Sequence, residues 1–100
     1  MGELTSRQRA LLRSIAQAVK PILQIGRDGV SDAVAETVEA ALNTRELLKI
    51  RVLETAPADA HALGEQLVAR IDGAHLVHVI GRMLVIYRRH PEKPEIRLPG

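Results

Sequence analysis

Two apolar segments near the end of the chain constrain the fold more than any other feature. They are His75–Ile80 and Met83–Arg88, and the dipeptide Gly81-Arg82 joins them. A two-residue connection that begins with glycine favours a β-hairpin, because glycine readily adopts the positive φ of such turns. Met83–Ile86 is apolar at every position, so we expect this last strand to be buried on both faces. The pattern therefore predicts a sheet with the last strand inside it and not at an edge.

Helical segments and short strands alternate along the rest of the chain. Helices are expected from Thr5 to about Val19, from Asp32 to about Asn43 and from Ala60 to Ile71, with strands at Ile22–Ile25 and Leu47–Leu53. A strand–helix–strand unit places its two strands in parallel, whereas the hairpin adds an antiparallel pair. The order αβαβαββ thus predicts an α/β (α+β two-layer) fold with a four-stranded mixed sheet. The chain has 100 residues, which is enough for one core.

The first helix carries a row of basic residues. Its buried face is expected to hold Leu11, Leu12, Ile15, Ala18 and Val19, and the opposite face then holds Arg9, Arg13 and Lys20. Pro21 ends the helix, so the basic row is expected to run towards the segment that follows. Such a row suits a polyanionic partner, and scattered solvated charge is the alternative interpretation.

A glycine-bounded tetrapeptide, Gly26-Arg27-Asp28-Gly29, follows the first strand and precedes a helix that Ser31 can cap. Two glycines let a backbone approach a phosphate chain closely, and amides at a helix N-terminus add partial positive charge. The GXXG loop of KH domains clamps nucleic-acid backbone in this way. A purely structural turn is the alternative, and Asp28 would repel a phosphate. If the glycines serve ligand approach, Gly29→Val is expected to weaken binding and to leave the fold intact.

Further basic side chains could extend this surface. Lys49 and Arg51 share the polar side of a strand, and Arg82 and Arg88 flank the last one. The net charge is +3 over residues 1–30, −4 over residues 31–65 and +3 over residues 66–100, which indicates a polarised surface. Ordinary charge at a sheet edge, which discourages aggregation, is the alternative interpretation.

The C-terminal segment is expected to be extended, because Pro91, Pro94 and Pro99 interrupt any regular element. It could lie along a nucleic acid, or it could pack back on the domain through Ile96 and Leu98. The sequence leaves both arrangements open.

Several functions find no support in the sequence. The chain has no cysteine, and His75 and His78, three positions apart on a strand, are expected to point to opposite faces, so no metal site is predicted. No catalytic arrangement, cofactor or small-molecule substrate is expected. Tyr87 is the only Phe, Tyr or Trp, which argues against a surface built on base stacking. The apolar runs are too short to span a membrane and no secretory signal is recognisable, so a cytoplasmic protein is expected.

The arrangement of these motifs resembles a known family. Lys20-Pro21, the strand leading into Gly26-Arg27-Asp28-Gly29 and the ending Val79–Arg88 occur together behind a basic N-terminal helix. In this order the chain resembles the CRM (chloroplast RNA splicing and ribosome maturation) domain, specifically the bacterial single-domain YhbY-type RNA-binding proteins. The resemblance implies a fold like the C-terminal domain of bacterial translation initiation factor three, and association with ribosomal RNA of large-subunit precursors.

We therefore expect residues 4–98 to form a single CRM-like domain that contacts the backbone of structured RNA and assists ribosome assembly. We expect it to work as a monomer and not to be an enzyme. The candidate RNA-binding residues are Arg9, Arg13, Lys20, Gly26, Arg27, Asp28, Gly29, Lys49, Arg51, Arg82 and Arg88. The alternative is a protein-interaction module that reaches the ribosome through the acidic helix face of Asp32, Glu36 and Glu39. A small RNA-degrading enzyme is a third hypothesis, without a supporting motif.

Overall fold

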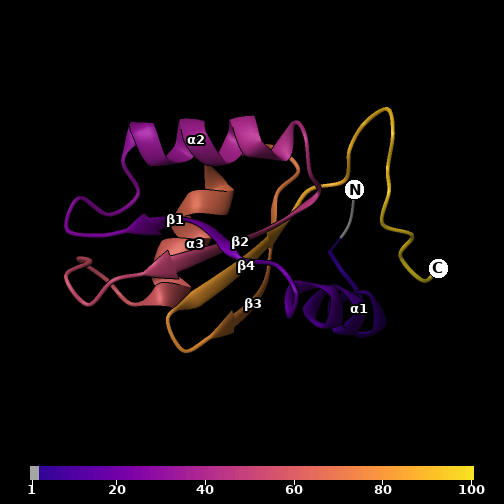
Figure 1. Cartoon of the computed structure of the whole chain (residues 1–100), viewed down its shortest axis with the longest axis horizontal. Coiled ribbons are helices and arrows are strands. Elements are labelled where there is room, and N and C mark those ends of the chain that lie inside the picture. Colours follow the sequence, from indigo (N-terminus) through magenta and orange to yellow (C-terminus); the bar gives the residue numbers. More distant parts are fainter. Residues whose placement is uncertain (1–2) are drawn as a thin grey trace.

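The computed structural model describes residues 3–100, which form three helices and four strands (Figure 1). These are α1 (Ser6–Ala16), β1 (Pro21–Ile25), α2 (Asp32–Leu42), β2 (Leu47–Val52), α3 (Ala60–Ala69), β3 (His75–Ile80) and β4 (Met83–Tyr87). The sheet order is β1-β2-β4-β3, with β1 parallel to β2 and the other neighbours antiparallel. The predicted α+β class, the mixed four-stranded sheet and the interior position of β4 are confirmed.

Side-chain caps determine where the three helices begin. The Thr5 hydroxyl accepts a hydrogen bond from the Gln8 N–H (3.1 Å) while the Gln8 side chain accepts one from the Thr5 N–H (2.9 Å), which is the predicted capping box. Ser31 and Asp59 cap α2 and α3 through single bonds of 3.2 and 2.8 Å. Each cap satisfies backbone donors that the helix itself leaves unpaired.

The main core lies between the sheet and the two helices α2 and α3. Leu48 and Ile50 of β2 and Leu84 and Ile86 of β4 are fully buried on this face. The helices contribute buried side chains at helical spacing, such as Val38 and Leu42 of α2. Because β2 and β4 are the two central strands, these side chains form the middle of the main core.

The second face of the sheet is covered only in part, by α1 and by the C-terminal segment (Figure 1). Leu12 and Ala16 of α1 pack against Val85 and Tyr87 of β4. The segment after β4 packs against the same side chains through Ile96 and Leu98. Of the two arrangements that the sequence left open, packing back on the domain is therefore the one observed. None of the helices in the described chain is long and apolar enough to cross a bilayer.

Helix α1 differs from its prediction in length and in orientation. It ends at Ala16, because the N–H groups of residues 17–19 bond the carbonyls three residues earlier and the chain then turns towards β1. The helix buries Leu12 and Ala16 and leaves Ile15 36% exposed. The predicted buried face included Ile15 because Ala18 and Val19 were counted as part of the helix. The observed buried face is instead centred on Leu12 and Ala16. As a result Lys20 lies outside the helix, and the predicted row with Arg9 and Arg13 does not form.

Glu46, which the sequence analysis did not single out, fastens the C-terminal segment to the domain. It is 6% exposed, and its carboxylate accepts hydrogen bonds from the N–H groups of His90 (2.8 Å), Glu95 (2.8 Å) and Ile96 (2.7 Å). Burial acts to raise the pKa of Glu46, but the three backbone donors outweigh it and hold the pKa below the ordinary value of 4.5. The carboxylate therefore stays charged inside the fold.

We expect Glu46→Gln to lower the free energy of unfolding by about 1–3 kcal/mol, because charge-assisted bonds to backbone donors are lost. The folded pKa lies below the unfolded one, so this stabilisation is complete above the unfolded pKa and is lost as the pH falls through the folded pKa. Urea denaturation across a pH series measures both effects. Glu36→Gln on the exposed side of α2 is the matched control, with an expected change under about 0.5 kcal/mol. A difference between wild type and Glu46→Gln that persists unchanged into acid would contradict this role.

Candidate functional site

The half of the second sheet face nearer the β3–β4 hairpin forms two rows across the four strands, and of these residues Val85 is buried against the α1 cluster. The strand register aligns Gln24, Arg51, Met83 and Ile80 in one row and Pro21, Lys49, Val85 and His78 in the next. Paired residues on neighbouring strands share a face, and so do residues two apart on one strand. Since Val85 packs towards α1, both rows lie on the α1 side of the sheet. We call these eight residues the open sheet face.

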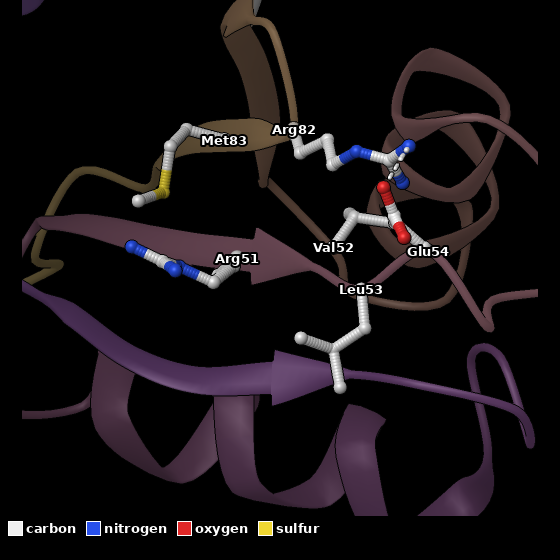
Figure 2. A pocket seen from close by; sticks show the side chains of 6 residues that line it. All are labelled: Arg51, Val52, Leu53, Glu54, Arg82 and Met83. Atoms are coloured by element: carbon white, nitrogen blue, oxygen red, sulfur yellow. Dashed lines mark ion pairs between the residues drawn. The ribbon is translucent and has the colours of Figure 1, made fainter.

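Basic side chains gather on the open sheet face. Lys49 and Arg51 project from β2, and Arg13 of α1 lines the same cavity as Lys49. A second hollow, lined by Arg51, Met83, Arg82 and Glu54 among others, continues the surface to the hairpin (Figure 2). The eight residues of the open sheet face include no acid. Glu54 lies beyond its end and pairs with Arg82 at 3.6 Å, and because both side chains are exposed this pair is weak.

The glycine loop lies at the same end of the sheet as Arg82. The Leu53 N–H donates to the Ile25 carbonyl (2.9 Å) and the Val52 N–H donates to the Arg82 carbonyl (2.7 Å), so three chain segments meet there. In the loop, the Gly29 N–H donates to the Gly26 carbonyl (3.0 Å), which makes a turn with Arg27 and Asp28 exposed at its tip. Arg27 is therefore an exposed basic residue at the same end of the sheet as Arg82.

The loop offers fewer backbone amides to a ligand than its position at a helix start suggests. The Gly29 N–H is bonded within the turn, and the Ser31 N–H donates to the Gly29 carbonyl (3.0 Å). Both donors therefore serve the loop itself. The side chain of Arg27 is the positively charged group at this turn, and it is exposed.

Lys20 lies at the other end of β1 from the glycine loop. It directly precedes Pro21, whereas Gly26 directly follows Ile25, so the length of the strand separates them by about 20 Å. The basic row predicted along the first helix does not run to the loop. Lys49 and Arg51 of the neighbouring strand lie between these two ends, beside Pro21 and Gln24.

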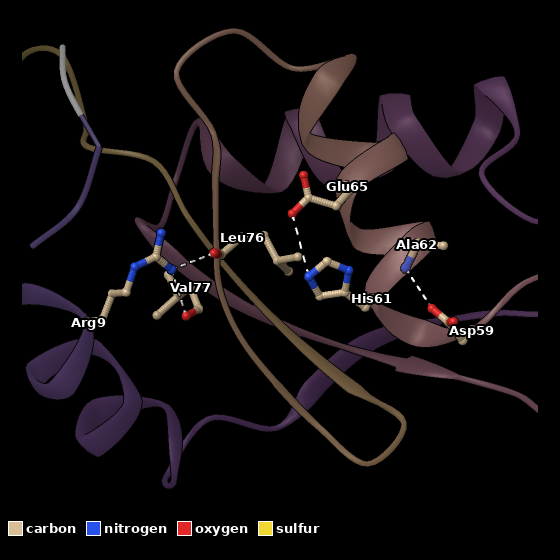
Figure 3. A network of polar contacts seen from close by, with 7 residues as sticks. All are labelled: Arg9, Asp59, His61, Ala62, Glu65, Leu76 and Val77. Atoms are coloured by element: carbon tan, nitrogen blue, oxygen red, sulfur yellow. Dashed lines mark hydrogen bonds and ion pairs between the residues drawn. The ribbon is translucent and has the colours of Figure 1, made fainter. Parts of the chain in front are cut away.

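Arg9 has a structural position. Its guanidinium donates from Nη1 to the carbonyls of Leu76 (2.8 Å) and Val77 (2.9 Å), as Figure 3 shows. These carbonyls lie at an irregularity of β3, where the register with β4 shifts between Leu76 and His78. A β-bulge disrupts the ladder locally, and Arg9 satisfies the acceptors that it exposes.

The same bulge corrects the prediction for the two histidines. His75 pairs with Tyr87 and His78 pairs with Val85, so the extra residue brings both imidazoles to the α1 side of the sheet. Burial, and after it the charge of Arg9, lowers the pKa of His75, whose ring stacks on Tyr87 at 6.3 Å between centroids. Among the described residues there is no group of three or more His, Cys, Asp or Glu side chains placed to hold a metal ion.

Arg88 is also held within the fold, on the α2 side of the sheet. Its side chain is 16% exposed, donates to the Asn43 side-chain oxygen at 2.9 Å and lies 3.7 Å from a Glu39 carboxylate oxygen. It follows the end of β4 that is opposite the hairpin, so the structure separates it from the open sheet face. The sequence could not distinguish it from Arg82, because α2 supplies its partners from 45 and 49 residues away.

The acidic face of α2, proposed as an alternative interaction surface, is partly neutralised. Asp32 pairs with Arg70, and Glu39 pairs with Arg88. These contacts leave Glu36 as the member of the row without an ion pair in the described part of the chain. The row is therefore a weaker anionic surface than its sequence suggests.

Gly29 is required by the fold, which contradicts the expectation that Gly29→Val leaves the fold intact. Its φ is +63°, and an added Cβ would lie 3.0 Å from the Cγ of Pro57 in the β2–α3 loop. Gly26 has no positive φ, and a Cβ there would meet only Leu53 and Thr55 at 3.5 and 3.6 Å. An L side chain would therefore disturb the backbone and the packing at Gly29 but not at Gly26.

We expect Gly29→Ala to lower the free energy of unfolding by about 1–3 kcal/mol, from the left-handed backbone and the contact with Pro57. Gly26→Ala is the matched control and is expected to change it by less than about 0.5 kcal/mol. Denaturant titrations of the two variants make the comparison. Equal stability of the two variants would contradict this structural role of Gly29.

Comparison with known proteins places the chain in a family. The sequence model of the CRS1 / YhbY (CRM) domain matches residues 4–88. The chain is 38% identical over 96 residues to the Bacillus subtilis "Probable RNA-binding protein YqeI", a match that covers 96% of this chain and 99% of that protein. It is 32% identical over 99 residues to a Haemophilus influenzae protein named "RNA-binding protein", covering 99% of this chain and 98% of that one.

A solved structure agrees with these sequence relationships. The solution structure of the Staphylococcus aureus protein SAV1595, described as a candidate RNA-binding protein, superposes with a TM-score of 0.81 at 40% sequence identity. The match covers 97% of this chain and 100% of that one. At this identity and coverage the likeness extends to the whole fold. The chain belongs to the CRS1 / YhbY (CRM) domain family.

Proposed function

We propose that this protein binds structured RNA, namely ribosomal RNA of the large-subunit precursor, and assists ribosome assembly without catalysing a reaction. The observation that carries the proposal is the basic surface running from Arg13 over Lys49 and Arg51 to Arg82, with Arg27 exposed in the loop at the same end of the sheet. Relatives of matching length are named RNA-binding proteins, which supports an RNA ligand for this surface. Residues 4–98 would act as one unit and as a monomer, with the C-terminal segment held by Glu46.

Phosphate groups are the part of the RNA that this surface suits best. Lys49 is half-buried and Arg13, Arg27, Arg51 and Arg82 are exposed, so their charged ends are available to a polyanion. Tyr87, the single Phe, Tyr or Trp side chain, is fully buried and offers no ring to a base. A surface with cations and without exposed aromatic rings favours readout of backbone position and shape.

The spacing of the basic side chains suits a single phosphate path. Lys49 and Arg51 are two residues apart on β2, which puts them about 7 Å apart on one face. Adjacent phosphates of one RNA strand have a similar spacing, so the two side chains can contact successive phosphates. Arg13 at one end and Arg27 at the other lengthen the path beyond the sheet.

Affinity for a structured ribosomal RNA fragment, measured across a salt series, tests this proposal. Each phosphate contact contributes close to one unit to the slope of log affinity against log salt. We expect Arg51→Gln to weaken binding and to reduce the slope by about one unit, and Arg27→Asp to do so as well.

Arg45→Gln is the matched control, because it removes the same charge from an exposed residue that lies two positions before β2 and is not part of the open sheet face. Its affinity loss should be small. If Arg51→Gln and Arg45→Gln give the same curves, the open sheet face is not the RNA-binding surface. If the wild type binds no RNA but still associates with ribosomes, the acidic face of α2 becomes the better candidate.

A further inference from the structure

A small cavity lies where the end of α1 meets the open sheet face. Its volume is about 120 Å³, and its floor is made of Ala16, Ile80, Met83 and Val85. Ile80 is 57% exposed and is one of two large apolar side chains left exposed in the described chain, the other being Ile15. Ala16 and Val85 are buried, so Ile80 and the half-buried Met83 are the part of this apolar lining that solvent reaches, and they offer a place for an apolar group of a ligand.

The rim of the cavity is polar and cationic. Arg13 and Lys49 line it, together with the Gln17 side chain at the end of α1 and the His78 imidazole of β3. Burial, and after it the charge of Arg13, lowers the pKa of His78, so the imidazole is neutral at pH 7. A neutral imidazole and an amide each offer one hydrogen-bond donor and one acceptor side to a ligand.

We propose that this cavity receives a single unpaired nucleobase of the bound RNA, with Arg13 and Lys49 contacting the phosphates beside it and Gln17 and His78 contacting the edge of the base. This inference rests on the proposed function, since it names the part of the RNA that the site would recognise in addition to phosphates.

The size and the charge of the cavity favour this occupant. A closed cavity of about 150 Å³ holds one benzene ring, so this open cavity of about 120 Å³ suits the single ring of a pyrimidine better than the fused rings of a purine, and it excludes a helix or a run of side chains. The lining includes two cations and no acid, which suits a group that carries negative charge on both sides. A nucleotide in an RNA chain has this combination of an apolar face, a hydrogen-bonding edge and flanking phosphates.

The base pocket also accounts for the lack of exposed aromatic rings. Aromatic platforms hold bases by stacking on a flat surface, whereas here the base would be held between aliphatic side chains of the sheet and the end of α1. Such a site holds one base, so it adds selectivity for an unpaired nucleotide within a structured RNA.

The test uses the full chain and an RNA hairpin with a one-nucleotide bulge, either uridine or an abasic residue. The abasic hairpin keeps every phosphate and lacks only the base. We expect the wild type to bind the uridine hairpin about tenfold more tightly, and Ile80→Asn to abolish this ratio without changing the affinity for the abasic hairpin. Ile15→Asn is the matched control, since it alters the other exposed isoleucine outside the cavity and should keep the tenfold ratio.

Equal affinity of the wild type for the two hairpins overturns the base pocket and leaves the phosphate surface of the proposed function standing. An Ile80→Asn effect of the same size on both hairpins also overturns it, because the side chain would then act on the fold or on phosphate contacts. Absence of salt-dependent binding to either hairpin contradicts the proposed function, and the base pocket with it.

Discussion

The packing of α1 on one half of the second sheet face is the contact on which the candidate site depends. Leu12 and Ala16 bury themselves against Val85 and Tyr87, and the helix ends there. A longer helix would cover Lys49 and Met83, and a missing helix would expose an apolar sheet. Because α1 covers only one half, the other half is left with cations on β2 and an apolar patch on β3 and β4.

The fold assigns different tasks to basic residues that look alike in sequence. Arg9 supplies donors to the carbonyls of the β3 bulge, and Arg88 is held by Asn43 and Glu39. Arg9 thereby satisfies backbone acceptors that the fold would otherwise leave unpaired, whereas the partners of Arg88 are two exposed side chains. Arg13, Lys49 and Arg51 line the open cavities instead. The RNA-binding surface we propose is therefore smaller than the set of basic residues in the sequence, and it lies on one side of the sheet.

Local signals in the sequence were sufficient for the element order and the sheet. The hairpin at Gly81 and the apolar run after it predicted the central strand, and the Thr5 cap predicted where α1 begins. The end of α1 could not be predicted, because Val19 continues the helical pattern while its tertiary contacts place it after a turn. Long-range contacts explain the other differences: the β3 bulge depends on α1, and Gly29 depends on a proline 28 residues later.

The role of Glu46 could not be predicted from the sequence either, because it also depends on long-range contacts. A lone carboxylate before a strand gives no sign in the sequence that three backbone donors from residues 90–96 will surround it. Burial of a charge requires such partners, so the residue reveals its role only once the chain is folded. By holding the C-terminal segment over α1 and β4, it keeps that half of the second face closed.

Amide chemical-shift mapping of the full chain during titration with a structured ribosomal RNA fragment tests the central claim most directly. The account predicts that the largest changes fall on β2 and β4 around Lys49, Arg51 and Met83 and on the loop at Arg27, with α2 unchanged. Changes concentrated on α2 around Glu36, with β2 and β4 unaffected, would contradict it.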